Sequence, residues 1–337
     1  MYSRNDDHGG DMQRRMKTML FGLIEQAERY SLDSEIVLID WNPPANRPLL
    51  KDAYHWPRHT KYCSVRSIVV PISIHQRYKD WEKIPIHGSV AKNLAFRRAR
   101  GEFILTTNVD ILFSEALARF LALKNLGDNT LYLINRTDVK RGVTRLNSLD
   151  EQLIYCQKNI LRVNRYSSEK SSLNSEGLPD FWNGGAGDFT LMSRKCWHRL
   201  RGYPETEDIL GLRLDGVLCY MAYAAGMETK ILKEPMYLYH LEHDMRCYSR
   251  EANWLTRTGL RSVLPERLLA KVRPWVRRFI PAKIEASEVS MMTCSELAGL
   301  VSDMVHGRRS YIYNDETWGL GNENFQEFEI VKKQRVT

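Results

Sequence analysis

The 337-residue chain lacks several features that would assign it to a class at once. It has no apolar run approaching the roughly 20 residues that a membrane-spanning helix needs. Its first residues, MYSRNDDHGGD, are polar and acidic, without the apolar core of a signal peptide. It has no internal repeats and no long low-complexity tract. These absences argue against membrane-spanning, secreted and repeat proteins, and they predict a cytoplasmic location.

Cysteine is present, but it is not arranged as a scaffold. The six cysteines are far apart and form no CxxC pair: Cys63, Cys156, Cys196, Cys219, Cys247 and Cys294. This spacing fits neither a zinc cage nor a small disulfide framework. We therefore expect free, mostly buried thiols.

Excess charge of one sign is confined to one segment. The chain has a net charge of +8, and residues 257–283 hold eight basic residues and one acid, which leaves the rest close to neutral. Apolar residues interleave with these charges, which is typical of a peripheral membrane contact or an anionic partner, although a solvated basic face fits equally well. The near-neutral body has no recognised nucleic-acid module, which argues against a nucleic-acid partner.

Strand-like and helix-like patterns alternate over the first 135 residues. Short apolar runs predict strands at 35–40, 67–74, 101–110 and 131–135, and helical periodicity predicts helices at 11–30, 88–99 and from Ser114 to Gly127. This alternation predicts an α/β fold with a mixed, mostly parallel sheet flanked by helices on both faces. In such sheets ligands bind beyond the carboxyl ends of the strands.

The second half of the body continues in the same way. Ser148-Leu-Asp-Glu151 reads as a capping box that opens a helix to about residue 163. Strands are expected at 188–193 and 228–233, around a helix at 215–225 that Gly226 ends. We expect one catalytic body over residues 1–245, followed by a basic, mainly helical C-terminal extension and tail over 246–337.

The first candidate for chemistry is NVD at 108–110. Asn108 and Asp110 present two oxygen-bearing side chains at the end of a predicted buried strand. Such a pair can face one hard cation and its diphosphate, because Mg²⁺ and Mn²⁺ favour carboxylate and phosphate oxygens. An Asx turn is the commoner role of this tripeptide taken alone.

The stretch KNLAFRRARGEFILTTNVD gives this motif a context. It resembles the family-2-type inverting glycosyltransferases of the GT-A fold, in which a helix carrying N-x-A…A-x-G-E precedes a strand that ends in a metal-binding D-x-D. The matching positions here are Asn93, Ala99, Gly101, Glu102 and Asp110. Asn108 departs from the family pattern, which usually has Asp there, so Asp110 would be the main ligand. The resemblance covers roughly residues 1–245.

The resemblance implies a nucleoside-diphosphate sugar donor, most simply a uridine one, and Mn²⁺ or Mg²⁺ as cofactor. The acid that ends the 35–40 strand would contact the base or ribose. Only Met1 and Tyr2 precede Ser3, so the first strand is either very short or begins upstream. The residues expected to hold the nucleotide sugar are Arg4, Asn5, Asp6, Asp40, Asn42, Lys92, Asn93 and Asn108.

The segment 200–226 resembles the part of the family that supplies the catalytic base. Asp215 lies eleven residues before Gly226, as the family's second acid lies before its glycine. An inverting transfer needs one carboxylate to take the proton from the acceptor hydroxyl. Glu207 and Asp208 form another acidic pair, whose spacing fits less well, and they are expected on the acceptor side. Asp215 could equally cap its helix, and the two roles are compatible.

Two further groups complete the expected site. His240 and His243, in MYLYHLEHD, resemble the extra metal ligands of some relatives, although core or hydrogen-bonding histidines are commoner. In DFWNGGAGDF, Trp182, Asn183 and Asp188 could contact a sugar, or the segment could be a plain loop.

Two rival functions remain open. A nucleotidyltransferase would share the sheet and the metal, but it needs a basic Gly-rich loop, whereas HGGD is acidic. A non-catalytic carbohydrate- or nucleotide-binding protein on a decayed transferase fold would explain Asn108. The expected acceptor, which the sequence does not specify, is a glycan, a lipid-linked sugar or a small molecule.

Overall fold

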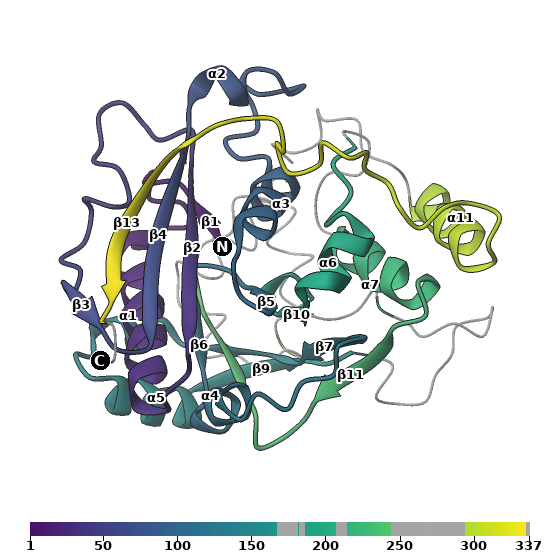
Figure 1. The fold of residues 1–337 in the computed structure, drawn as a ribbon. Coiled ribbons are helices and arrows are strands. Elements are labelled where there is room, and N and C mark those ends of the chain that lie inside the picture. Colours follow the sequence, from purple (N-terminus) through teal and green to yellow (C-terminus); the bar gives the residue numbers. More distant parts are fainter. Residues whose placement is uncertain (167–180, 182–185, 207–213, 244–267, 269–293, 335–337) are drawn as a thin grey trace.

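The computed structural model describes residues 1–166, 181, 186–206, 214–243, 268 and 294–334. Its strands form three sheets, and helices pack between and outside them (Figure 1). The fold is therefore a mixed α/β architecture with parallel and antiparallel pairing.

The first sheet has helices on both faces. Its strand order is β1 (Tyr2–Ser3), β2 (Ser34–Trp41), β4 (Cys63–Val70), β13 (Gln326–Lys333) and β3 (His59–Thr60). Alternate side chains of a strand point to opposite faces. Ile36 and Leu38 accordingly pack against α1 (Met12–Arg29), whereas Val37 and Ile39 pack against α3 (Gly88–Arg98). The first sheet thus lies between the two longest helices of the first hundred residues.

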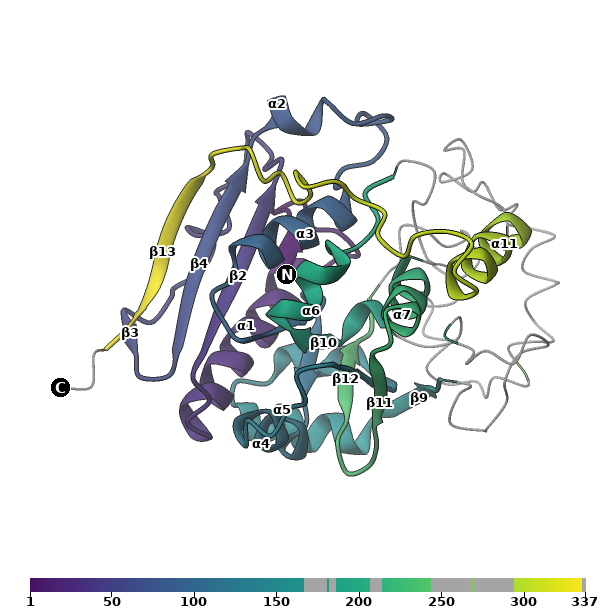
Figure 2. The ribbon, with the colours of Figure 1, turned by 45° about the vertical axis from the view of Figure 1, so that its right-hand side comes forward.

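The second sheet carries the largest apolar cluster. Its order is β11 (Glu228–Leu232), β7 (Thr130–Ile134), β10 (Thr190–Ser193) and β5 (Phe103–Thr106). Its covering helices are α6 (Arg194–Leu200), α7 (Leu214–Ala224) and α11 (Cys294–Val305). The middle of helix α7, residues 216–222, is buried, and α11 packs along this helix (Figure 2). The start of α7, which carries Asp215, is therefore held on a well-packed core.

The third sheet is short and supplies most of the polar centre described below. Its order is β6 (Ile111–Phe113), β12 (Leu238–Leu241), β8 (Arg136–Val139) and β9 (Ile160–Asn164). The short helix η1 (Arg141–Arg145) and α5 (Leu149–Lys158) pack on one face of it. Helix α4 (Glu115–Ala122) packs where the second and third sheets meet. The remaining short helices are α2 (Ile72–His75) and η3 (Ala186–Asp188).

Several local predictions are confirmed. The Ser148 and Glu151 side chains form both halves of the capping box, and Ser114 caps α4 by accepting a hydrogen bond from the Leu117 amide. Gly226 follows α7 with a φ of 71°, as expected of a helix-ending glycine. The cysteines whose side chains are described are free and buried: Cys63, Cys156, Cys196 and Cys219.

The prediction of a mostly parallel sheet is wrong. Among the described residues, five of the ten strand pairings are antiparallel. One cause is that the strand predicted at 101–110 covers only Phe103–Thr106, and a second strand, which was not predicted, follows it at Ile111–Phe113. Residues 103–106 pair with β10, and after a turn residues 111–113 pair with β12 in another sheet. The strand predicted at 67–74 has the expected length but lies four residues earlier, at Cys63–Val70, because Pro71 ends it.

The tail of the chain returns to the body. Residues 326–333, assigned from the sequence to a mainly helical extension, form β13 between β4 and β3. Before it, the chain crosses α3, where Arg97 and Arg98 donate to backbone carbonyls of residues 316–323. The predicted boundary near residue 245 therefore does not separate this strand from the first sheet. The basic segment 257–283 lies outside the described residues except for Leu268.

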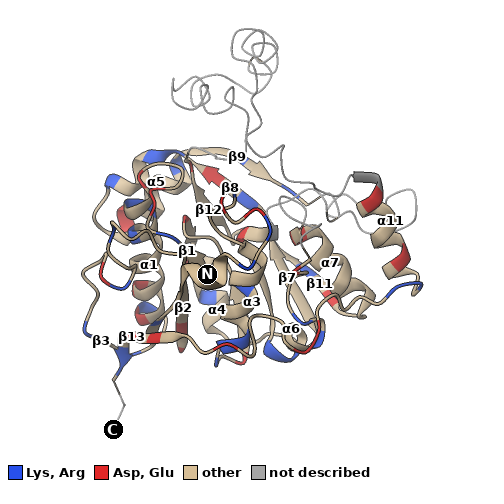
Figure 3. Ribbon diagram, turned by 90° about the horizontal axis from the view of Figure 1, so that it is seen from above, with Lys and Arg blue, Asp and Glu red and all other residues tan. Residues whose placement is uncertain are grey.

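Figure 3 shows that lysine, arginine and acidic residues are interspersed over the described elements. Among these elements, no helix combines the length and apolar character that a bilayer crossing requires.

Two glycines of similar backbone conformation test the packing beside α3. Gly202 and Gly226 have φ of 72° and 71°, but a Cβ at Gly202 would collide with the Asn93 amide, whereas one at Gly226 would meet nothing within 4 Å. We predict that Gly226→Ala lowers the free energy of unfolding by about 1–2 kcal/mol, the cost of a left-handed non-glycine residue. Gly202→Ala should cost at least about 2 kcal/mol more, because Asn93 loses buried hydrogen bonds.

Urea unfolding of the two variants measures this difference. Equal losses of stability in the two variants would contradict the proposed contact between Gly202 and Asn93.

Candidate metal centre

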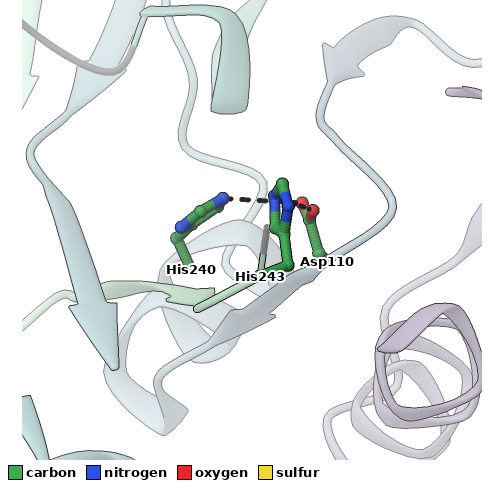
Figure 4. Close-up of side chains that lie close together, drawn as sticks. All are labelled: Asp110, His240 and His243. Carbon is green, nitrogen blue, oxygen red and sulfur yellow. Dashed lines mark ion pairs between the residues drawn. The ribbon is translucent and has the colours of Figure 1, made fainter. Parts of the chain in front are cut away.

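Asp110, His240 and His243 converge where the second and third sheets meet. Asp110 immediately precedes β6, and the antiparallel β6–β12 pairing sets Ile111 opposite His240. The Leu241 amide donates to the Asp110 carbonyl at 2.9 Å, and this bond fixes the two segments together. One potential ligand atom from each side chain lies within 4.8 Å of the others (Figure 4). The structure therefore contains a three-residue group that could hold a metal ion.

The carboxylate has an unused oxygen in this group. His243 Nε2 lies 3.0 Å from Asp110 Oδ2, and His240 Nε2 lies 3.9 Å from Asp110 Oδ1. Oδ1 is buried and has no hydrogen-bond partner among the described residues. Asp110 itself is only 5% exposed. An unsatisfied buried carboxylate oxygen is costly, and a bound cation would satisfy it.

Asp138 orients His240 from the other side. The Asp138 Oδ1 atom lies 3.0 Å from His240 Nδ1, so it favours the tautomer with the proton on that nitrogen. Nε2, which lies 3.9 Å from Asp110 Oδ1, is then the ring nitrogen that faces the carboxylate, and it could bind a cation once it has lost its proton. A carboxylate behind a ligating histidine is a common arrangement at protein metal sites.

The network continues from Asp138 to a second carboxylate. Arg136 Nε lies 2.9 Å from Asp138 Oδ1, and Arg136 Nη1 lies 3.0 Å from Asp188 Oδ2. The amide nitrogen of Asn108 donates to the other oxygen of Asp188. The metal group is thus the end of a continuous series of buried polar contacts along β8 and η3.

The charges of this network shift its pKa values. Burial alone would raise the pKa of the Asp110 carboxyl, but His240, His243 and Arg15 outweigh it and hold that pKa well below its usual range. The pKa of Asp138 is lowered in the same way by His240, Arg136 and Arg162, again against burial. Both groups are therefore carboxylates at neutral pH, as metal ligation requires.

Asp215 lies on the same side of the molecule as this network. Its carboxylate is directly against Gly187, where a Cβ would collide with it, and Gly187 precedes the Asp188 that binds Asn108. Lys92 Nζ lies 3.2 Å from Asp215 Oδ1, and the Asp215 side chain is 27% exposed. Asp215 and the metal group are thus joined by a short series of contacts, and Asp215 remains accessible to solvent.

Five of the eight residues expected to hold the nucleotide lie at the carboxyl ends of β1 and β2: Arg4, Asn5, Asp6, Asp40 and Asn42. Arg4 donates to the Asn42 carbonyl at 2.7 Å, and Asn5 donates to the Pro48 carbonyl at 3.0 Å. Asp6 accepts a bond from the His8 amide. These contacts tie the 3–11 loop to the loop after β2. They position both loops, so nucleotide contacts would come from the atoms that remain accessible.

Asp40 is enclosed rather than open. It is 0% exposed, one oxygen accepts the Leu50 amide at 2.8 Å, and the other has no partner among the described residues. Burial raises the pKa of Asp40 to about 6. A base or ribose contact at Asp40 would therefore need the loop after β2 to move.

Three other predicted contacts are different in the structure. Asn93 is fully buried, and its amide is used by the backbone of Tyr203 and the side chain of Glu205, so it fixes α3 to that turn instead of facing a ligand. Asp188 is buried, with both oxygens occupied by Asn108 and Arg136, so it does not present them to a sugar. The Asn108 amide nitrogen donates to Asp188. Trp182, Asn183, Glu207 and Asp208 lie outside the described residues.

Sequence reasoning missed Arg15, Arg136 and Asp138. Arg15 was discoverable, because a charged residue interrupts the apolar face formed by Met12, Met16 and Met19. Arg136 and Asp138 alternate along β8, but the predicted strand ended at residue 135, so their shared face was not recognised.

No model of a known protein family matches the chain, and a comparison with curated proteins finds no match either. Its function must therefore be inferred from the site itself.

The buried carboxyl of Asp40 predicts a pH-dependent stability effect. Its pKa is about 6 in the folded chain, against 3.8 for the side chain of an ordinary exposed Asp. The folded state thus binds more protons than the unfolded state between these values, and stability falls as pH rises through that window. We predict that Asp40→Asn is more stable than wild type at pH 8, by on the order of 1–3 kcal/mol, and that this gain shrinks toward pH 4.

Urea unfolding at pH 4.5 and pH 8 tests this, with Asp52→Asn as the control because Asp52 is largely exposed. A gain for Asp40→Asn that does not vary with pH would contradict the assigned burial of charge.

Proposed function

We propose that this chain is a metal-assisted glycosyltransferase of the GT-A type, which transfers a sugar from a nucleoside-diphosphate donor, uridine-based by resemblance, to an acceptor hydroxyl. The observation that carries the proposal is the position of two groups. A buried Asp-His-His group and an accessible carboxylate, Asp215, are linked through Asn108, Asp188 and Gly187. Sugar transfer from such a donor needs a cation at the diphosphate and a base at the acceptor hydroxyl, which attacks the anomeric carbon.

The residues present fit a divalent transition metal. Asp110 Oδ1, His240 Nε2 and His243 Nε2 would hold it. Bound there, the ion would neutralise charge on the departing diphosphate. Two imidazoles and one carboxylate suit Mn²⁺ better than Mg²⁺, which prefers oxygen ligands and retains its waters. Mn²⁺ is therefore the proposed cofactor.

Asp215 would act as the base. Its carboxylate takes the proton from the acceptor hydroxyl as that oxygen attacks the anomeric carbon, and attack opposite the leaving diphosphate inverts the configuration. Lys92 orients this carboxylate. Burial would lower the pKa of Lys92, but Asp215 and neighbouring groups raise it overall, so the lysine stays charged.

A second candidate is a nucleotide- or carbohydrate-binding protein that has lost catalysis. Asn108 favours it, because this side chain would supply no charge to a cation, and its amide nitrogen donates to Asp188. Binding of a nucleotide without turnover would distinguish it from the transferase.

Binding of metal and nucleotide is the first prediction of this proposal. Mn²⁺ together with uridine diphosphate should raise the melting temperature more than either alone, since a ligand that binds only the folded state stabilises it. Mg²⁺ should bind at least about tenfold more weakly, because two of the three ligands are imidazoles. His243→Ala should lose most of the Mn²⁺ effect. Absence of a nucleotide shift, with or without Mn²⁺, would count against both candidate functions.

Turnover of a nucleotide sugar is the second prediction of this proposal. With Mn²⁺ present, wild type should hydrolyse a matching uridine-diphosphate sugar slowly, water replacing the acceptor. Asp215→Asn should lower this rate by roughly 10²–10⁴-fold, the usual contribution of a general base. Its Mn²⁺-dependent nucleotide affinity should change little. Equal hydrolysis by Asp215→Asn and wild type would remove Asp215 from the mechanism.

A further inference from the structure

Arg15 connects the metal group to the 3–11 loop. It lies on the first turns of α1 and is 3% exposed, so its guanidinium is buried. The Nη1 atom of Arg15 donates to Asp110 Oδ2 at 2.9 Å. Its Nε atom donates to the Gly10 carbonyl at 3.1 Å, and its Nη2 atom donates to the His8 carbonyl. One side chain therefore holds both the candidate ligand and the loop.

The contacts of Asp110 divide between its two oxygens. Oδ2 accepts from Arg15 and faces His243, whereas Oδ1 is unpartnered and faces His240. Arg15 is the only arginine or lysine whose ion pair with Asp110 is seen among the described residues. In this arrangement Arg15 supplies positive charge that a bound divalent cation would also supply.

A cation held by Asp110 and the two histidines would lie close to the guanidinium. Like charges at such distances in a buried site repel strongly, because little solvent screens them. The cation also competes for the carboxylate that keeps Arg15 in place. Metal binding should therefore weaken the Arg15–Asp110 ion pair.

Release of Arg15 would also affect the loop that it holds. At residues 7–11 the backbone turns tightly, with Asp7, Gly9, Gly10 and Asp11 at positive φ, and Arg15 binds two carbonyls of this segment. A freed guanidinium next to a bound cation needs an anionic partner. A diphosphate offers oxygens that match the planar fork of arginine, and the same cation binds it.

We propose that Arg15 is an exchangeable counter-ion: it neutralises Asp110 until a divalent cation binds, and then moves with the 3–11 loop onto the diphosphate of the donor. Metal binding would in this way precede and promote nucleotide binding. This inference rests on the proposed function, because it needs the cation and the diphosphate at this site. Arg15 acts here as a positioning and binding residue and takes no part in proton transfer.

A static role for Arg15 makes the opposite prediction for metal affinity. If Arg15 only held Asp110 in position, Arg15→Gln would weaken Mn²⁺ binding, because the ligand would be displaced. If it is a competing counter-ion, Arg15→Gln should bind Mn²⁺ more tightly, by about threefold to tenfold. Arg14→Gln is the matched control, since Arg14 is adjacent and exposed. Its ion pair with Asp11, at 3.7 Å, is a long one on the surface. Titration with Mn²⁺ alone measures the affinities.

Hydrogen exchange of the loop provides a readout independent of activity. The amides of His8 and Gly10 are hydrogen-bonded within the loop, to Asp6 and Asp7. In wild type and Arg14→Gln, Mn²⁺ alone should speed exchange over residues 5–11 by about tenfold, and uridine diphosphate with Mn²⁺ should reverse this. In Arg15→Gln the loop should not respond to Mn²⁺, and the affinity for uridine diphosphate with Mn²⁺ should fall by about tenfold or more.

The outcomes separate the two proposals. If wild type binds Mn²⁺ but its loop does not respond, or if Arg15→Gln binds Mn²⁺ more weakly than Arg14→Gln, the counter-ion proposal is overturned and the proposed function stands. If wild type binds no Mn²⁺, both are overturned. Arg15→Lys covers the case in which Arg15→Gln does not fold: it keeps the charge but not the fork, so it should keep wild-type Mn²⁺ affinity and lose nucleotide affinity.

Discussion

Burial of the Asp110 carboxylate is the constraint on which the centre of this protein depends. A lone carboxylate at this depth would be protonated or would destabilise the fold. Here it is kept ionised by Arg15 from α1, His240 from β12 and His243 just beyond that strand. Segments that are more than 200 residues apart in the chain must therefore pack together before this charge is compensated. The first and third sheets are coupled through it.

The polar contacts that continue from His240 also connect the two ends of the candidate site. Asp138 orients His240, Arg136 joins Asp138 to Asp188, and Asp188 holds Asn108. Each member is buried or nearly so, which makes their relative positions firm. Asp215, at the far end, touches this series at Gly187, and its carboxylate also pairs with Lys92. The geometry thus combines a buried Asp-His-His group with a carboxylate that solvent can reach.

Local features of the fold were predictable because they depend on neighbouring residues. The capping box at Ser148, the glycine after α7 and the strand at Ser34–Trp41 follow from short patterns. Asp110 and the two histidines were predicted as metal ligands from the resemblance to GT-A transferases, because residue type and position after strands favoured commoner roles. The predictions that were wrong concern contacts between residues far apart in the chain. Nothing near residues 103–113 signals that the two halves of this run enter different sheets, and nothing near Asn93 signals that the Tyr203 backbone will occupy its amide.

Strand β13 places a late segment of the chain between two early ones. Gln326 pairs with Val69 and Lys333 with Thr60, so β4 has a free edge until the ribosome has released about 330 residues (Figure 1). Until then β4 is an open template for pairing with another chain. Long-range closure of this kind is slow, because the loop entropy is lost before the pairing energy is gained. A nascent or truncated chain that ends before β13 would therefore be prone to intermolecular association, and it would need protection during synthesis that the finished protein does not need.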